Sequence, residues 1–236
     1  FSKAIIQKRQ DEFRHMPTLK IEEVTSASVI NLGKLKIKFF DITHAIPDAI
    51  GVIIETPYGN VIYPGDFRFE LDENSNPVNI EHYEKLGKEN NLVLFLESTN
   101  AETPGFSIPE KVVYQNLEKI VTEAKNRIII GMFSSHIERV IEIVKVAEKH
   151  DKKVAIDGYS LKASFEIVKA LGYFHPKKDV LIPVEKIDSY LPSKVIAICT
   201  GSQGEENASL MRIANKRHKH IRITKDDTVI LSSSVI

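Results

Sequence analysis

Residues 127–172 read RIIIGMFSSHIERVIEIVKVAEKHDKKVAIDGYSLKASFEIVKALG, and this stretch decides the fold. Two apolar runs of strand length, RIIIGM and KVAIDG, are each followed by a longer stretch whose apolar residues recur every three or four positions. Such alternation of buried strands with amphipathic helices is typical of a parallel sheet covered by helices on both faces. We therefore expect an α/β fold with a doubly wound parallel sheet.

The same alternation continues on both sides of this stretch. Downstream, the strand KVIAICTG precedes the helical pattern EENASLMRIANKRH, and a last strand, TVILSSS, follows. Upstream, NLVLFLEST is a continuous apolar run that predicts a strand buried on both faces. Ser107 and Glu110 form a capping-box pattern, with Pro109 in the first turn, ahead of another helix. The doubly wound domain is therefore expected at 104–231.

The residues before it, 1–103, are rich in strand patterns. After a mixed-charge helical stretch at the start, alternating apolar and β-branched residues in LKIEEVT and SASVINLGKLKIKFFDIT predict half-buried strands. The tract TPYGN, between GVIIE and VIYPGDF, predicts a hairpin with Gly59 at the tight position. One short helix, IEHYEKLG, is expected among polar turns.

The composition sets limits on function. The 236 residues carry 32 basic and 32 acidic side chains, so no net charge draws polyanions to the whole chain, and a nucleic-acid site has to be local. No apolar run approaches the ~20 residues of a membrane span, and no signal peptide is visible, so we expect a cytoplasmic protein with no membrane partner. The single Cys199 excludes disulfides and a cysteine metal cage, and its apolar surroundings predict a buried strand residue.

Small and polar residues follow each strand of the predicted parallel sheet. Because the carboxyl ends of such strands meet at one edge, main-chain N–H groups there can approach a phosphate closely, and His136 can add a donor. The alternative is that Ser135 and Ser160 only cap helices and that the glycines only shape a turn. The ATP and dinucleotide fingerprints are absent. The four clusters are Phe133–His136, Asp157–Ser160, Thr200–Gly204 and Ser232–Ser234.

Two further features stay open from the residues alone. His44 and Asp66 each end a predicted strand unit and are compact metal-ligand types, but a catalytic zinc needs three protein ligands, so a structural role is the alternative. The tract NKRHKHIRITK, 215–225, has seven basic or His residues in eleven. It is either a solvated surface or a local contact for RNA, whose affinity would fall with added salt.

Four long strings carry a resemblance to a known family: THAIPDAIGVIIETPYGNVIYPGDFRFE, LESTNAETPGFS, FSSHIERV and ICTGSQGEENASLMRIAN. They resemble, in order and over nearly the whole chain, segments of the bacterial ribonuclease J family of metallo-β-lactamase/β-CASP nucleases. The resemblance implies part of a metallo-β-lactamase αββα sandwich over 1–103 and a doubly wound β-CASP domain over 104–231. Residues 232–236 would begin the return to the first domain.

The function that the resemblance implies is metal-dependent cleavage of single-stranded RNA, both 5′-to-3′ exonucleolytic and endonucleolytic, in RNA processing and decay. Two divalent ions would serve as cofactors, with zinc expected and manganese or magnesium as alternatives. Homo-oligomer formation and RNA-decay partners are also implied.

The resemblance assigns roles residue by residue. His44 matches a metal ligand, and Asp66 matches the carboxylate that bridges both metals and is needed for catalysis. Glu97 matches the first acidic β-CASP motif, where the family often has Asp, and His136 matches the second motif, which contacts the scissile phosphate or helps the leaving group. The family segments that line the RNA channel match Ser134, Ser135, Gly201, Ser202, Gln203, Ser232, Ser233 and Ser234.

The departures from the family lead to a separate expectation. No HxHxDH string occurs, the third β-CASP histidine is absent, and the chain starts at Phe1 without Met. We expect a fragment that binds metal weakly or not at all and has no nuclease activity by itself. A non-catalytic RNA-binding or scaffold paralogue is the alternative, and a dinuclear hydrolase of small substrates would share His44 and Asp66 without explaining the β-CASP strings.

Overall fold

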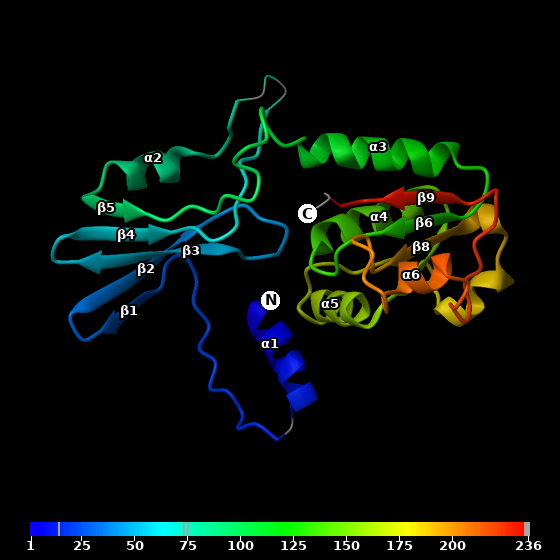
Figure 1. The fold of residues 1–236 in the computed structure, drawn as a ribbon, viewed down its shortest axis with the longest axis horizontal. Helices are drawn as coiled ribbons and strands as arrows, with labels where there is room; N and C mark the ends of the chain where they lie inside the picture. Colours follow the sequence, from blue (N-terminus) through cyan, green and yellow to red (C-terminus); the bar gives the residue numbers. More distant parts are fainter. Residues whose placement is uncertain (14, 73, 75, 234–236) are drawn as a thin grey trace. The chain divides into compact units, whose positions relative to one another are not determined.

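A computed structural model describes residues 1–13, 15–72, 74 and 76–233 (Figure 1). The chain divides into two compact units. One unit comprises Thr18–Pro109, and the other comprises Phe1–Pro17 together with Glu110–Ile236.

The larger unit contains the expected parallel sheet. Its four strands lie in the order β7-β8-β6-β9, and every neighbouring pair is parallel. The sequence prediction of a parallel sheet is therefore confirmed. The strands are β6 (Ile128–Gly131), β7 (Lys153–Asp157), β8 (Val195–Cys199) and β9 (Thr228–Leu231).

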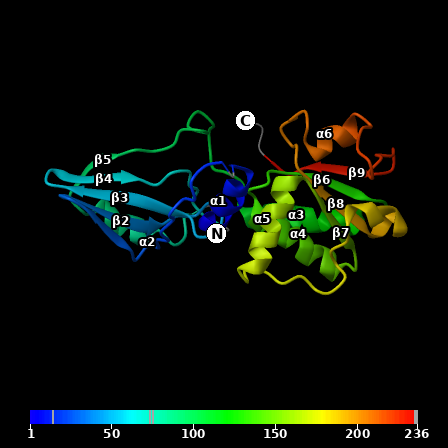
Figure 2. The ribbon, with the colours of Figure 1, turned by 90° about the horizontal axis from the view of Figure 1, so that it is seen from below.

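Helices cover both faces of this sheet (Figure 2). On one face, α3, α4 and α5 pack on alternate strand residues such as Ile130 and Ile196, and on the other face α6 and a 3-10 helix pack on Ile129 and Ala197. Because strand side chains alternate between faces, both residue sets have to be apolar, which explains the continuous apolar runs. The helical elements are α1 (Ser2–Gln10), η1 (Asp11–Phe13), α3 (Glu110–Glu123), α4 (Ile137–Lys149), α5 (Tyr159–Ala170), η2 (Val184–Ser189), η3 (Pro192–Lys194) and α6 (Ser209–Ala214).

Cys199 confirms the interpretation of a buried strand residue. It is the last residue of β8 and has no exposed surface. Burial raises the pKa of its thiol to about 12, so the thiolate is not formed near neutral pH.

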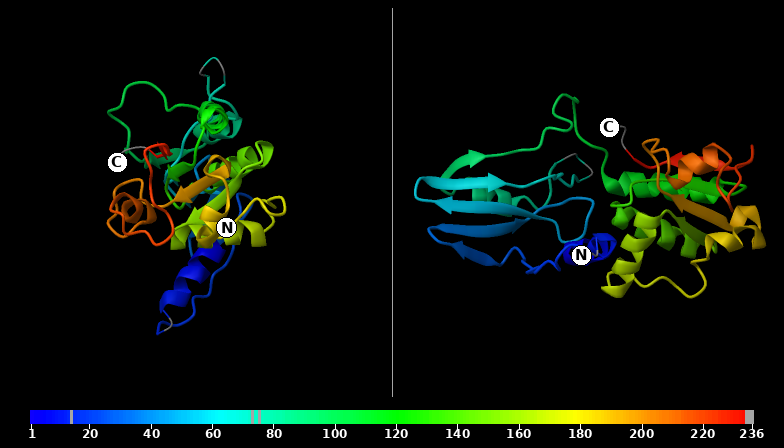
Figure 3. Two further views of the ribbon diagram at one scale, coloured as in Figure 1. Left: turned by 90° about the vertical axis from the view of Figure 1, so that its right-hand side faces the viewer. Right: turned by 60° about the horizontal axis from the view of Figure 1, so that its bottom comes forward.

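The smaller unit contains a five-stranded sheet in the order β1-β2-β3-β4-β5 (Figure 3). The first four strands are antiparallel, and β5 joins β4 in parallel. The predicted hairpin is confirmed, since Thr56 pairs with Gly59 across the two-residue turn Pro57–Tyr58. Gly59, which has a φ of 138°, is the first residue of β4 and not one of the two turn residues. The elements are β1 (Val29–Leu32), β2 (Leu35–Asp41), β3 (Ile50–Thr56), β4 (Gly59–Tyr63), α2 (Glu81–Gly87) and β5 (Asn91–Leu94).

Three local expectations were wrong. Strand β5, the edge strand of its sheet, is exposed along its whole length, because no layer within the described residues covers its side chains. No strand forms over 18–25. The capping box fails because α3 begins at Glu110 itself, whose carboxylate instead forms an ion pair with Arg139.

No helix within the described ranges is both long and apolar enough to cross a membrane.

Candidate functional site

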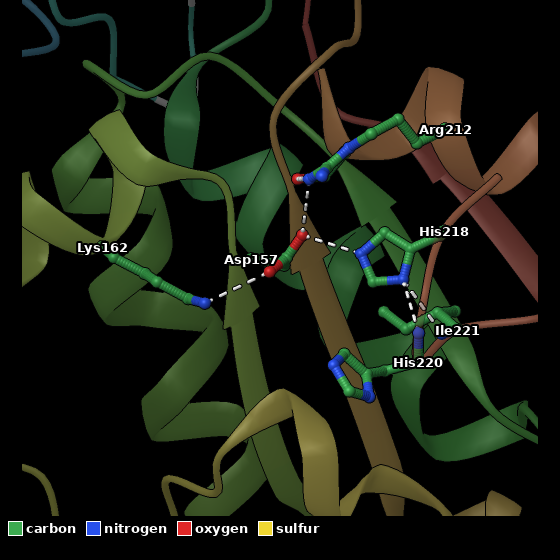
Figure 4. A network of polar contacts seen from close by, with 7 residues as sticks. Asp157, Lys162, Arg212, His218, His220 and Ile221 are labelled. Atoms are coloured by element: carbon green, nitrogen blue, oxygen red, sulfur yellow. Dashed lines mark hydrogen bonds and ion pairs between the residues drawn. The ribbon is translucent and has the colours of Figure 1, made fainter. Parts of the chain in front are cut away.

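Asp157, the last residue of β7, is the centre of a polar network at the carboxyl edge of the parallel sheet (Figure 4). Its Oδ1 accepts a hydrogen bond from Lys162 Nζ at 3.1 Å. Its Oδ2 accepts from His218 Nε2 at 2.9 Å and from an Arg212 guanidinium nitrogen at 3.4 Å. The carboxylate therefore joins three elements: α5, α6 and the loop after α6.

The tautomer of His218 follows from its partners. Its Nδ1 accepts the main-chain N–H groups of His220, at 3.2 Å, and Ile221, at 2.9 Å, so the ring proton belongs on Nε2. That proton is donated to Asp157. The ring thus satisfies polar groups on both sides, and His218 is a buried structural residue and not one of the solvated basic residues of the tract 215–225.

Asp157 stays ionised over a wide pH range. Burial by itself would raise its pKa, but hydrogen bonds from Ser209, His218 and Lys162 outweigh this effect and lower the pKa to about 2. A permanent negative charge is therefore held inside the edge of the sheet, and it fixes the positions of the two cations beside it.

The polar clusters predicted from the sequence do end neighbouring strands of one parallel sheet. The last residues of neighbouring strands are paired with one another. Cys199 pairs with Asp157 and with Gly131, and Gly131 also pairs with Leu231. Main-chain hydrogen bonds continue the alignment past the strands: Thr200 N–H donates to the Asp157 carbonyl at 3.3 Å and Ser232 N–H donates to the Gly131 carbonyl at 2.8 Å. Ser134, Ser135, Gly201, Ser202, Gln203, Ser232 and Ser233 thus lie at or just beyond this edge, while Ser234 lies outside the described residues.

The helix-cap alternative does not hold for two serines. The N-cap of α4 is His136, and the N-cap of α5 is Gly158, so neither Ser135 nor Ser160 occupies the capping position. The His136 ring lies 5.5 Å from the Phe133 ring, centroid to centroid, and its side chain is only partly buried. His136 can therefore present a ring nitrogen at the edge of the sheet.

Arg139 also forms contacts that stabilise this edge of the sheet. Its side chain is 10% exposed and forms an ion pair with Glu110 at the start of α3. The same guanidinium donates to the main-chain carbonyl of Ser232 at 3.0 Å and to its Oγ at 3.3 Å. One buried arginine thus ties the end of β9 to the beginning of α3.

In the smaller unit, His44 and Asp66 lie side by side. His44 Nε2 and Asp66 Oδ2 are 4.0 Å apart, and the side chains are 34% and 72% exposed. Two ligands bound about 2.1 Å from a tetrahedral zinc lie roughly 3.4 Å apart, so a small rotation of the exposed Asp66 would let both side chains bind one ion. The pair fits two positions of a metal site.

The main chain around His44 is held by its neighbours. Arg68 N–H donates to the Thr43 carbonyl at 2.9 Å, which joins the loop of His44 to the loop of Asp66. Tyr83, on α2, is hydrogen-bonded to the main chain of Thr43, and its burial raises its own pKa. The Tyr83 ring packs edge-on against Phe69 at 5.6 Å. These contacts preorganise the two loops.

Glu97 is in the same unit as this pair, but its Oε2 accepts the main-chain N–H of Thr99 at 2.7 Å. Among the residues described, no group of three or more His, Cys, Asp or Glu side chains is arranged to hold a metal ion. His44 and Asp66 are thus brought together, whereas Glu97 is placed in a local turn and His136 belongs to the other unit.

The Asp157 network was missed as a site by sequence reasoning. Asp157 was seen only as part of a strand-end cluster, and its partner His218 is 61 residues away in the chain. Spacing could not connect them, because the helix predicted to run to 218 ends at Ala214, and the loop then turns back to the sheet. A signal in the sequence that could have indicated this site is the charged Asp157 at the end of an otherwise apolar run.

Comparisons with known proteins agree with the fold and with the family resemblance of the sequence. Residues 125–236 match the family described as "Ribonuclease J, beta-CASP domain". Ribonuclease J of Mycoplasma genitalium is 34% identical over 233 residues, which cover 99% of this chain and 41% of that protein. Ribonuclease J 2 of Staphylococcus aureus is 35% identical over 210 residues, 89% of this chain and 38% of that protein.

A crystal structure of a protein of unknown function from Enterococcus faecalis is similar over 99% of this chain and 62% of its own length, with a TM-score of 0.66 and 14% identity. That likeness concerns the fold alone. The chain spans about 41% of the length of the curated Mycoplasma genitalium relative. The chain therefore contains a ribonuclease J β-CASP domain, which occupies residues 125–236.

Proposed function

We propose that this chain is part of a metal-dependent ribonuclease that cleaves single-stranded RNA from the 5′ end and also internally. The observation that carries the proposal is the 4.0 Å approach of His44 Nε2 to Asp66 Oδ2, in a chain whose 34%-identical relative is named ribonuclease J. A ribonuclease needs a group that activates water and groups that hold the phosphate. The His44–Asp66 pair and the carboxyl edge of the parallel sheet are candidates for these two tasks.

In this proposal His44 and Asp66 bind divalent ions, zinc first and manganese or magnesium as alternatives. When bound, two such ions would supply an activated water and would neutralise charge on the phosphate. Asp66, whose side chain is 72% exposed, would contribute its carboxylate to holding both ions. Glu97 acts as a supporting carboxylate, and His136 holds or donates a proton at the phosphate.

We further propose that the smaller unit is the latter part of a metallo-β-lactamase domain. Its exposed apolar run Leu92–Leu96 supports this, since five consecutive apolar side chains there are each 38–57% exposed. Exposed apolar surface of this kind usually marks a face that another layer covers. In a longer protein, residues outside this chain would supply that covering layer, together with an HxHxDH motif.

The test is to measure bound zinc and manganese, and cleavage of labelled single-stranded RNA, for the full-length protein and its Asp66→Ala and His44→Ala variants. We expect both variants to lose metal and activity together. Glu22→Ala is a matched control, because Glu22 is a 76% exposed carboxylate of the same unit. Wild-type metal content and turnover in Asp66→Ala would refute the assignment.

A second measurement addresses the chain by itself. We expect the 236-residue chain to hold metal weakly and to leave RNA intact, since only two ligands of a site are brought together. Elemental analysis that found stoichiometric zinc in the purified chain would contradict this expectation. RNA binding without cleavage in the full-length protein would favour a scaffold role.

A further inference from the structure

Two cations and an exposed aromatic ring surround the carboxyl end of β7. Lys162 and Arg212 bind opposite oxygens of the Asp157 carboxylate, and their side chains remain 48% and 46% exposed. Tyr159, the first residue of α5, is 65% exposed. Tyr159 lies in the strand-end cluster Asp157–Ser160, whereas Lys162 and Arg212 were not among the residues expected to contact RNA.

The charges around Asp157 do not cancel. His218 donates as a neutral ring, so one carboxylate faces two full positive charges, and the cluster keeps one excess positive charge at a half-exposed position. Among the described residues, Lys162 uses one of its three N–H bonds, on Asp157, and the Arg212 contacts with Asp157 and Ser209 both use the same guanidinium nitrogen. Both side chains therefore have donors left for an anion.

Asp157 also makes this arrangement rigid. Because its carboxylate is buried and stays charged, it holds two long side chains that would otherwise move freely, which lowers the entropy lost when they bind a ligand. Gly158 keeps the end of β7 close to the next strand, since a Cβ at this position would lie 2.5 Å from Thr200 Oγ1. Tyr159 is the residue after Gly158, so its main chain lies at this same end of β7.

Together these groups have the chemistry of a single-stranded nucleic-acid contact. Cations meet successive backbone phosphates, and an exposed aromatic ring stacks on a base without demanding a particular sequence. Tyr159 and Lys162 are three residues apart on α5, so they lie on neighbouring positions of one helix face. We propose that Tyr159, Lys162 and Arg212 form an RNA contact, in which the two cations bind backbone phosphates and Tyr159 stacks on a base. This inference rests on the proposed ribonuclease function.

The experiment measures binding of a fluorescein-labelled oligoadenylate to the full-length protein, with a chelator present to prevent cleavage, over a series of salt concentrations. Each lost phosphate contact should lower the slope of log affinity against log salt by about 0.7. We expect Lys162→Gln and Arg212→Gln each to show that change, and Tyr159→Leu to weaken binding about five-fold or more at every salt concentration.

Matched variants separate this role from a structural one. Lys169→Gln removes a lysine of the same helix that is paired with Glu166, and Tyr58→Leu removes an 82% exposed tyrosine; neither should change binding. Lys162→Arg, Arg212→Lys and Tyr159→Phe should keep most of the affinity, because charge and ring are retained. If the glutamine variants fold and bind with the wild-type slope, the contact is wrong while the proposed function stands. If the wild-type protein does not bind the oligoadenylate at all, the proposed function itself fails.

Discussion

His218 Nε2 and Asp157 Oδ2 lie 2.9 Å apart and join positions separated by 61 residues. This hydrogen bond fixes the loop after α6 against the end of β7. Since His218 also accepts two main-chain N–H groups through Nδ1, the ring is fully bonded, and the loop depends on it for its conformation.

Asp157→Asn should destabilise the larger unit in a pH-dependent way. Because the pKa of Asp157 is lowered from 3.8 to about 2 in the folded protein, its charge contributes stability above pH 4 that is lost as the pH falls towards 2. A shift of this size corresponds to on the order of 2 kcal/mol. Urea unfolding of wild type and variant at pH 7 and pH 2.5 checks this, and the difference between them should shrink at the lower pH.

Asp151→Asn is the control for that measurement. Asp151 also has a lowered pKa, from its hydrogen bond with Lys194, but its side chain is 88% exposed. Exposed ion pairs contribute little, so its loss should be hard to detect. Equal losses in the two variants would show that burial of Asp157 is not what makes its charge matter.

Arg139→Met should be among the most damaging substitutions in the larger unit. It removes both hydrogen bonds to Ser232 and the ion pair with Glu110, whose side chain is 14% exposed. Breaking a buried ion pair from one side typically costs about 3–5 kcal/mol. Thermal or urea unfolding measures this, and the double variant with Glu110→Met should recover part of the loss. No recovery would mean that the contacts to Ser232 dominate.

Gly158→Ala should destabilise the same unit through the backbone. Gly158 has φ 111° and ψ 127°, a conformation that residues with a Cβ rarely adopt, and the added methyl group would collide with Thr200. We expect a loss of about 1–3 kcal/mol. Gly87→Ala is the matched control, because a Cβ there meets nothing within 4 Å and an alanine favours the helix. A Gly158→Ala protein with unchanged stability in urea unfolding would contradict this explanation.

Particular residues show how much of this could be predicted from sequence. The run Ile128–Gly131 and its repeats specified the parallel sheet because both faces of each strand must be apolar, and the 0% exposure of Ile128, Ile129 and Ile130 confirms it. Leu92–Leu94 have the same apolar pattern but are exposed. An apolar pattern shows which side chains a strand is able to bury, but it does not show whether another layer is present to cover them. The common position of the polar clusters could also be predicted, because the carboxyl ends of neighbouring parallel strands lie at one edge of the sheet.

The partners within the sites could not be predicted in the same way. Glu110 suggested a capping box, but a buried Arg139 from another helix offered its carboxylate a stronger, charge-assisted interaction. Asp157 and His218 meet because a loop reverses at Lys216, which has a φ of 58°. Neither long-range pairing leaves a periodic signal in the chain.

The Cys199 thiol should be inert in the folded protein. It has no exposed surface and its pKa is raised to about 12, whereas a thiol-disulfide reagent needs an accessible thiolate. We expect the native chain to react with Ellman's reagent only at the rate of opening of the sheet, and the urea-unfolded chain to react at once. Rapid stoichiometric reaction of the native chain would show that β8 is accessible.

Phe95→Lys and Leu94→Lys distinguish an exposed edge from a covered one. In the 236-residue chain these side chains are 57% and 55% exposed, so lysine should change stability by less than about 0.5 kcal/mol and should reduce self-association. In the full-length protein a covering layer would make the same substitutions bury a charge, with a loss of several kcal/mol. Urea unfolding of both lengths measures the contrast. Equal, small effects in the two would mean that nothing packs on this strand, and the proposed metallo-β-lactamase domain would lose its main structural support.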